Sequence, residues 1–151
     1  MTSPRPEAIG LIVVDHGSRR AESNAMLEEM AGMVAGVVPY PIVEPAHMEL
    51  AEPSIQSAFD TCVARGATTV VISPYFLLPG KHWDEDIPHL AAEAASRHPG
   101  VPYLVAAPLG LHPLMAQAVA ARVGHCLSHV AGDAGECEAC AGTGRCAVQT
   151  A

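Results

Sequence analysis

The chain has 151 residues, of which half are apolar and 16% are charged, which is typical of a globular protein and not of a disordered chain. Its formal net charge of −8 argues against nucleic acid as a partner, because nucleic-acid-binding proteins present basic surfaces. No apolar run approaches the ~20 residues that a membrane span needs, so no membrane association is expected.

Strands and helices are predicted to alternate along the chain. Short apolar runs, rich in β-branched residues and bounded by turn residues, predict strands at Ile9–Val14, Ile42–Leu50, Thr69–Phe76 and Tyr103–Ala107. Apolar residues at helical spacing predict helices from about Arg20 to Val37, from Pro53 to Gly66, from Asp84 to Pro99 and from His112 to Leu127. Alternation of this kind implies parallel strands joined by crossover helices.

Each predicted helix has an apolar stripe that should face the core. For the first helix the stripe is Met26, Met30, Met33, Val34 and Val37. For the second it is Ile55, Phe59, Cys62 and Val63, and for the last it is Leu114, Ala118, Val119, Val123 and Leu127. We therefore expect a three-layer α/β domain resembling flavodoxin, with a four-stranded parallel sheet in the order 2-1-3-4.

The carboxyl ends of the predicted strands carry His16, Glu49, the loop around His82, and His112. Open α/β sheets bind their ligands at this edge. Two imidazoles and one carboxylate, His16, His82 and Glu49, form a plausible ligand set for a divalent first-row metal. His47 is expected to share a face of its strand with Glu49 and is an alternate or supporting ligand. Each histidine taken alone is equally compatible with a surface or capping position.

Basic residues are scarce, yet Arg19, Arg20 and Lys81 lie beside these histidines. One interpretation is a cationic mouth for an acidic ligand, and the other is ordinary solvated surface. Trp83, the single tryptophan, either lines a ligand or packs its loop onto the sheet.

The C-terminal segment, residues 130–151, is rich in Gly and Ala and cannot form a core of its own. We therefore divide the chain into an α/β domain, residues 1–129, and a Cys-rich tail, residues 130–151. Five cysteines are present, an odd number that does not suggest a disulfide framework. Four thiols, Cys126, Cys137, Cys140 and Cys146, suit either zinc or an iron–sulfur cluster, and their spacing does not choose between them.

Four segments resemble those of the sirohydrochlorin chelatases. They are Val-Asp-His-Gly-Ser-Arg-Arg at Val14–Arg20, Pro-Ala-His-Met-Glu-Leu-Ala-Glu-Pro-Ser at Pro45–Ser54, the Ser73–Pro88 segment with Gly-Lys-His-Trp, and the cysteine-bearing region His125–Cys146. The last of these resembles the plant and algal members, the SirB type. The resemblance extends from about Ile9 to Cys146.

This resemblance implies a class II chelatase that inserts ferrous iron into sirohydrochlorin, releases two protons and uses no ATP. It implies that His16 and His82 are catalytic, that His16, Glu49 and His82 bind the metal, and that Cys126, Cys137, Cys140 and Cys146 hold a 2Fe-2S cluster. Contacts to the polycarboxylate ring are expected from Ser18, Arg19, Arg20, Lys81 and Trp83. The short members of the family are homodimers, so we expect a homodimer.

Two alternatives remain open from the sequence. Cobalt insertion toward cobalamin is one, because His and Glu ligands do not separate Co2+ from Fe2+. A metal-trafficking or redox-sensing protein without turnover is another. Residues 1–8 predict no signal peptide. If the protein comes from a plant or an alga, we expect it in the chloroplast stroma, with a transit peptide outside this sequence. Otherwise we expect it in the cytoplasm.

Overall fold

The computed structural model describes residues 4–150. The chain forms two compact units, one that extends to Gly110 and one that starts at Leu111. The sequence analysis placed the division after residue 129. In the structure, by contrast, the last helix belongs to the second unit together with the tail. No helix among residues 4–150 is long and apolar enough to cross a membrane.

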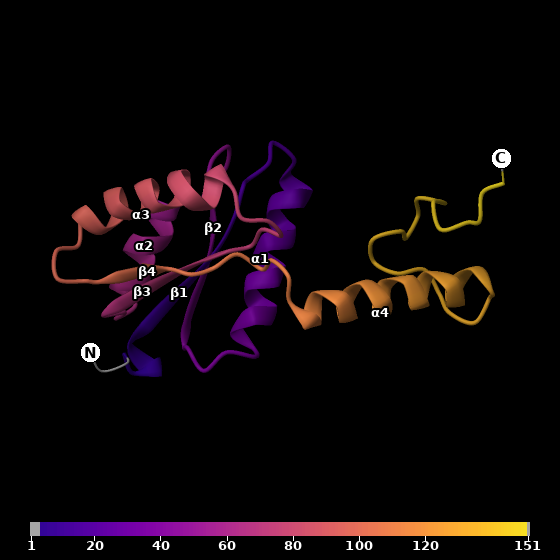
Figure 1. The fold of residues 1–151 in the computed structure, drawn as a ribbon, viewed down its shortest axis with the longest axis horizontal. Coiled ribbons are helices and arrows are strands. Elements are labelled where there is room, and N and C mark those ends of the chain that lie inside the picture. The colour runs from indigo at the N-terminus through magenta and orange to yellow at the C-terminus, as the bar shows by residue number, and fades with distance from the viewer. Residues whose placement is uncertain (1–3, 151) are drawn as a thin grey trace. The chain divides into compact units, whose positions relative to one another are not determined.

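The first unit is built on a parallel four-stranded sheet in the order β2-β1-β3-β4 (Figure 1), which confirms the predicted fold. The strands are β1 (Ile9–Asp15), β2 (Ile42–His47), β3 (Thr69–Pro74) and β4 (Tyr103–Val105). The helices of this unit are α1 (Ala21–Ala35), α2 (Ile55–Ala64) and α3 (Ile87–Ser96). A 3-10 turn spans Pro6–Ala8, and a π-helical turn spans His82–Asp86.

Helices cover the sheet on both faces (Figure 1). The core between the sheet and the α2–α3 layer is centred on Phe59, Ile12, Ile72 and Ile87, none of which is solvent-exposed. A smaller core beneath α1 contains Leu11, Val13, Leu27 and Ala31. The three layers therefore enclose two separate apolar cores.

The predicted apolar face of α1 was wrong in part: Val34 packs against the smaller core and Met30 is half-buried, but the other three residues are exposed. Met26 and Met33 are 70% and 67% exposed, and Val37, beyond the end of the helix, is 83% exposed. Leu27 and Ala31, four residues apart on a neighbouring stripe, face the sheet instead. Because α1 carries apolar side chains on more than one stripe, its sequence alone did not specify which stripe is buried.

The second strand is shorter than predicted, because β2 ends at His47 and not at Leu50. Pro45 lies within this strand and does not interrupt it. A proline cannot donate a hydrogen bond, but β2 is an edge strand with a free side, where that loss is tolerated.

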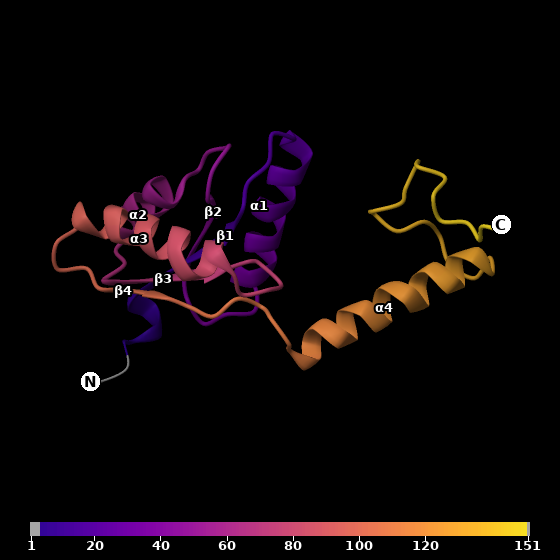
Figure 2. The ribbon, with the colours of Figure 1, turned by 45° about the horizontal axis from the view of Figure 1, so that its top comes forward.

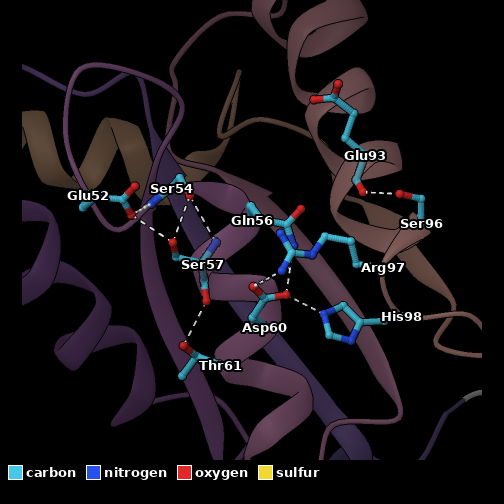
Figure 3. A network of polar contacts seen from close by, with 10 residues as sticks. All are labelled: Glu52, Ser54, Gln56, Ser57, Asp60, Thr61, Glu93, Ser96, Arg97 and His98. Carbon is cyan, nitrogen blue, oxygen red and sulfur yellow. Dashed lines mark hydrogen bonds and ion pairs between the residues drawn. The ribbon is translucent and has the colours of Figure 1, made fainter.

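Polar contacts fasten α2 to the loops around it (Figure 3). Ser54 caps the helix, since its hydroxyl accepts a hydrogen bond from the backbone N–H of Ser57 at 3.1 Å. Asp60 on α2 accepts a hydrogen bond from His98 Nε2, and its other oxygen lies 3.8 Å from the Arg97 guanidinium. These contacts join α2 to the segment that follows α3.

The second unit contains α4 (Pro113–Val130) and the tail that follows it (Figure 2). The expectation that α4 has an inward apolar stripe was wrong, because none of its residues is buried. The physical reason is that the tail offers mainly Gly, Ala and small polar side chains to pack against it. The exposed apolar residues on this helix are Leu114, Val119, Val123, Leu127 and Val130.

Candidate active and metal-binding site

Two loops meet at the carboxyl edge of the sheet, one after β1 and one after β2. The register pairs Asp15 with His47, so the residues that follow each strand start side by side. The backbone N–H of Met48 donates to the carbonyl of Asp15 at 2.9 Å, and that of Glu49 donates to the carbonyl of His16 at 3.1 Å. The loops that carry His16 and Glu49 are therefore joined through their main chains.

Gly17 permits this close approach. A Cβ atom at this position would lie 1.9 Å from the carbonyl oxygen of Glu49, and the φ angle of +91° is itself unfavourable for any residue with a side chain. A glycine is therefore required where the two loops touch.

The side chains of His16 and Glu49 face each other. His16 Nε2 lies 3.1 Å from Glu49 Oε1, with the side chains 44% and 54% exposed. His16 Nδ1 also lies 3.3 Å from the carbonyl oxygen of Gly17. Both groups remain accessible to a ligand from solvent.

His82 reaches the same place from a different part of the chain, the π-helical turn before α3. Its ring centroid lies 4.8 Å from that of His16, at an interplanar angle of 70°. Its Nδ1 lies 2.8 Å from Asp86 Oδ2. The structure thus brings together the three predicted metal ligands His16, Glu49 and His82, which are far apart in the sequence.

A hollow of about 380 Å³ adjoins these side chains. Its lining residues are Met48, Glu49, His82, Asp86, His89 and Leu90. Two of the three predicted ligands, Glu49 and His82, therefore border open space. Sequence reasoning missed Asp86 as a member of this site, although its spacing of four residues from His82 was a usable signal.

His47 does not belong to this ligand group, which corrects the expectation that it is an alternate ligand beside Glu49. Because β2 ends at His47, the alternation of a strand does not extend to Glu49. The His47 side chain is completely buried, and its Nδ1 lies 2.6 Å from Asp15 Oδ1. Glu49, in contrast, projects into solvent.

Two of the residues expected to contact a ligand already form hydrogen bonds within the protein. Ser18 holds its own loop: its N–H donates to Asn24 Oδ1 at 3.0 Å, and its hydroxyl accepts from the N–H of Arg20 at 3.0 Å. Trp83 Nε1 donates to the carbonyl of Ala106 at 2.9 Å, which packs the half-buried indole onto the sheet edge.

Three cations near the site are exposed: Arg19, Arg20 and Lys81. Among residues 4–150, the arginines that form ion pairs are Arg5, Arg65, Arg97 and Arg122. The three cations near the site therefore keep their charge available for an anionic ligand.

Cys126 on α4 and the three cysteines of the tail lie near one another within the second unit. The thiols influence one another: Cys137 raises the pKa of Cys140, and burial together with the neighbouring Cys126 on α4 raises the pKa of Cys146. The backbone N–H groups of Cys140 and Ala139 donate to the Cys137 sulfur and lower the pKa of its thiol below the ordinary 9.0. These four thiols supply the same donor atoms as four-thiolate metal sites.

Two histidine contacts fold the tail back along α4. His125 Nε2 lies 3.1 Å from the carbonyl oxygen of Gly135, and His129 Nδ1 lies 2.9 Å from that of Ala134. Arg122 and Glu138 form an ion pair next to these contacts. The contacts explain how Cys126, on the helix, comes near cysteines of the tail.

Across residues 4–150, no group of three or more His, Cys, Asp or Glu side chains has the spacing of a ready-made metal site. Neither the sheet-edge group nor the four thiols forms a closed cage. Binding of an ion at either place would require side-chain rotation, which the half-exposed positions of His16, Glu49 and His82 permit.

Comparison with known proteins supports the resemblance noted from the sequence. The chain is 60% identical to the chloroplastic sirohydrochlorin ferrochelatase of Arabidopsis thaliana over 140 residues, which are 93% of this chain and 62% of that protein. It is 38% identical to a sirohydrochlorin cobaltochelatase of Methanococcus maripaludis over 80 residues, covering 53% of this chain and 56% of the relative.

A similar fold is found in the sirohydrochlorin chelatase SirB from Bacillus subtilis subspecies spizizenii in complex with cobalt. That structure gives a TM-score of 0.72 at 32% identity and covers 77% of this chain and 50% of the other. The chain spans about three fifths or less of the length of these known proteins. The CbiX family model matches residues 10–126, and the chain therefore belongs to the CbiX family.

Proposed function

We propose that this chain is a sirohydrochlorin ferrochelatase, which inserts Fe2+ into sirohydrochlorin to form sirohaem without ATP. The observation that carries the proposal is the meeting of His16, Glu49 and His82 at the carboxyl edge of the sheet. The ferrochelatase named among its relatives is 60% identical over most of this chain.

The chemistry needs two things from the protein. The metal must be held loosely enough to pass to the four ring nitrogens, and two pyrrole N–H groups must each lose a proton. An open group of two imidazoles and one carboxylate suits the first need better than thiolates, which bind such metals more tightly. A neutral imidazole accepts a proton near neutral pH, which suits the second. We assign these tasks to His16 and His82, and metal capture to Glu49 together with them.

The polycarboxylate periphery of sirohydrochlorin needs cationic partners. Arg19, Arg20 and Lys81 are exposed around the site, on a protein whose net charge is −8. We assign to them the binding of substrate carboxylates by charge-assisted hydrogen bonds. Ser18 and Trp83 then contribute by fixing the shape of the loops that border the ring.

The test is anaerobic mixing of the protein with sirohydrochlorin and excess ferrous iron while the tetrapyrrole absorption bands are recorded. Many turnovers per protein chain are expected. A change limited to one equivalent would instead indicate the metal-trafficking alternative, in which the site stores metal without catalysis. The same assay with Co2+ tests cobalt insertion, which the M. maripaludis relative favours. A higher kcat/KM with Co2+ than with Fe2+ would reverse our choice of metal.

We further propose that Cys126, Cys137, Cys140 and Cys146 hold a 2Fe-2S cluster. Two observations support it: these thiols shift one another's pKa values, and none of residues 130–150 is buried. Such a cluster would cross-link the tail to α4 and supply a one-electron redox centre. Anaerobically purified protein should contain two irons and two sulfides per chain. Stoichiometric zinc without sulfide would contradict the proposal.

We also propose a homodimer. A single domain offers a shallow edge for a large flat ring, and the apolar residues of α4 are left exposed to solvent. Scattering at micromolar concentration should give about twice the chain mass of 15.7 kDa. A monomer mass would contradict it.

For a plant or algal source we propose that the protein is located in the chloroplast stroma, as the Arabidopsis relative suggests. Plastid fractionation tests this.

A further inference from the structure

A histidine that acts on a metal or a proton must present the correct nitrogen. A neutral imidazole has one N–H and one lone pair, and only the nitrogen with the lone pair can bind a metal or accept a proton. In metal sites the other nitrogen usually donates its N–H to a carboxylate or carbonyl, which fixes the tautomer and the direction of the ring.

We propose that Asp86 is the positioning residue of His82. Its Oδ2 lies 2.8 Å from His82 Nδ1. An ionised carboxylate can only accept a hydrogen bond, so Nδ1 donates, and Nε2 carries the lone pair that meets the metal or the proton. This inference rests on the proposed function, in which His82 is a catalytic residue.

The local backbone fixes this pair in place. The two residues are the first and last of the π-helical turn, and the N–H of Ile87 closes the turn by donating to the carbonyl of His82. Ile87 is completely buried in the larger core. Between them, Trp83 is anchored by its indole N–H to the carbonyl of Ala106. Isolated π-helical turns often mark functional sites, because the wider turn redirects side chains.

A purely structural role explains Asp86 less well. Although it stands at the N-cap position of α3, its side chain makes no capping hydrogen bond to that helix. Asp84 and Glu85 already place negative charge in the same turn, where it favours the positive end of the helix dipole. Asp86 also lines the hollow that Glu49 and His82 border, so its carboxylate faces the site.

The test compares Asp86→Leu, which removes the acceptor, with Asp86→Asn, which keeps an oxygen acceptor but loses the charge. The matched control is Asp84→Asn, an equal charge change in the same turn at an exposed residue. Nitrogen-15 NMR of histidine-labelled, metal-free protein reads the His82 tautomer at a pH about two units above the ordinary histidine pKa of about 6.5. Calorimetry with Co2+ alone reads metal affinity, and thermal unfolding reports whether each variant is folded.

In the wild type and Asp84→Asn, His82 should carry its proton on Nδ1. In Asp86→Leu the resonances should move toward the Nε2–H form, and the affinity for Co2+ should fall about 10–100-fold. Asp86→Asn should recover most of the Nδ1–H form and lie between the two in affinity. An unchanged tautomer in folded Asp86→Leu would overturn the proposal, as would a Co2+ affinity equal to that of Asp84→Asn.

The tautomer is measured without sirohydrochlorin, so the result separates this proposal from the proposed function. A wild type that fails to turn over sirohydrochlorin, but whose His82 tautomer depends on Asp86, contradicts the enzyme assignment alone. A wild type that turns over, with a tautomer independent of Asp86, contradicts the positioning role alone.

Discussion

The imidazole of His47 is completely buried, and its Nδ1 lies 2.6 Å from the carboxylate of Asp15. The pair bridges β1 and β2 at the last register position of the two strands, directly before His16 and Glu49 emerge. Among residues 4–150, His47 Nε2 has no hydrogen-bond partner, so the contact with Asp15 is the one polar interaction of this ring. It joins the two strand ends that present the candidate site.

Removal of this contact should destabilise the fold. Asp15→Ala leaves a buried imidazole without any partner, which costs about 1–3 kcal/mol. The double variant Asp15→Ala/His47→Leu removes both polar groups and should recover most of that loss. Urea unfolding of the two single variants and the double variant measures the coupling. Additive losses would show that the two side chains do not support each other.

The three proposed ligands should be separable from the fold. His16, Glu49 and His82 are each about half exposed, so truncation creates no core cavity. His16→Ala and His82→Ala should each lose most chelatase turnover while their unfolding midpoints stay close to that of the wild type. Glu49→Gln should weaken Co2+ binding in calorimetry more than sirohydrochlorin binding. Turnover equal to wild type in either histidine variant would remove that residue from the mechanism.

Gly17→Ala should damage both stability and metal binding. Its Cβ would overlap the carbonyl oxygen of Glu49 at 1.9 Å, so the His16 loop must move away from the Glu49 loop. The matched control is Gly32→Ala in α1, where a Cβ meets nothing within 4 Å and helix propensity favours Ala by up to about 1 kcal/mol. Thermal unfolding and Co2+ titration distinguish them. A Gly17→Ala protein that matches the control in both would contradict the close approach.

The contact between Asp60 and His98 should make stability depend on pH under acidic conditions. The hydrogen bond from His98 lowers the pKa of Asp60 below its ordinary 3.8. A carboxyl whose pKa is lower in the folded state stabilises the fold above its unfolded-state pKa and loses that contribution as pH falls through the folded value. The difference in unfolding free energy between the wild type and Asp60→Asn should therefore narrow as pH falls below about 4. Urea unfolding across this range tests it, with exposed Glu29→Gln as the control expected to show no such narrowing.

The five cysteines should divide into two reactivity classes. Burial raises the pKa of the Cys62 thiol to about 12, so it is protonated and shielded at neutral pH. In metal-free native protein, iodoacetamide should modify Cys126 and the three tail thiols and leave Cys62 intact until the protein is unfolded. Cys137, whose pKa is lowered, should react first. Peptide mass spectrometry reads each site, and labelling of Cys62 at the rate of the tail thiols would contradict this division.

Much of the fold and of the candidate site was predictable from the sequence. The apolar runs identified the strands, their alternation with helices predicted a parallel sheet, and the likeness to flavodoxin supplied the strand order, which the structure confirms. The carboxyl ends of all strands in a parallel sheet lie at the same edge, so His16, Glu49 and His82 were expected to lie close together. The structure places them close together. Pattern and topology placed these residues near one edge of the sheet, and the resemblance to the chelatases then identified them as the expected metal ligands.

Only the tertiary structure decided which of several similar groups is buried, paired or exposed. The choice of Leu27 and Ala31 over the methionines of α1 depends on how closely that helix approaches the sheet. The burial of His47 depends on where β2 stops and on a carboxylate 32 residues earlier in the chain. The partner of His82 depends on a π-helical turn that the sequence did not reveal. These outcomes rest on contacts between distant segments, whose energies depend on packing and hydrogen-bond geometry and leave no periodic pattern in the sequence.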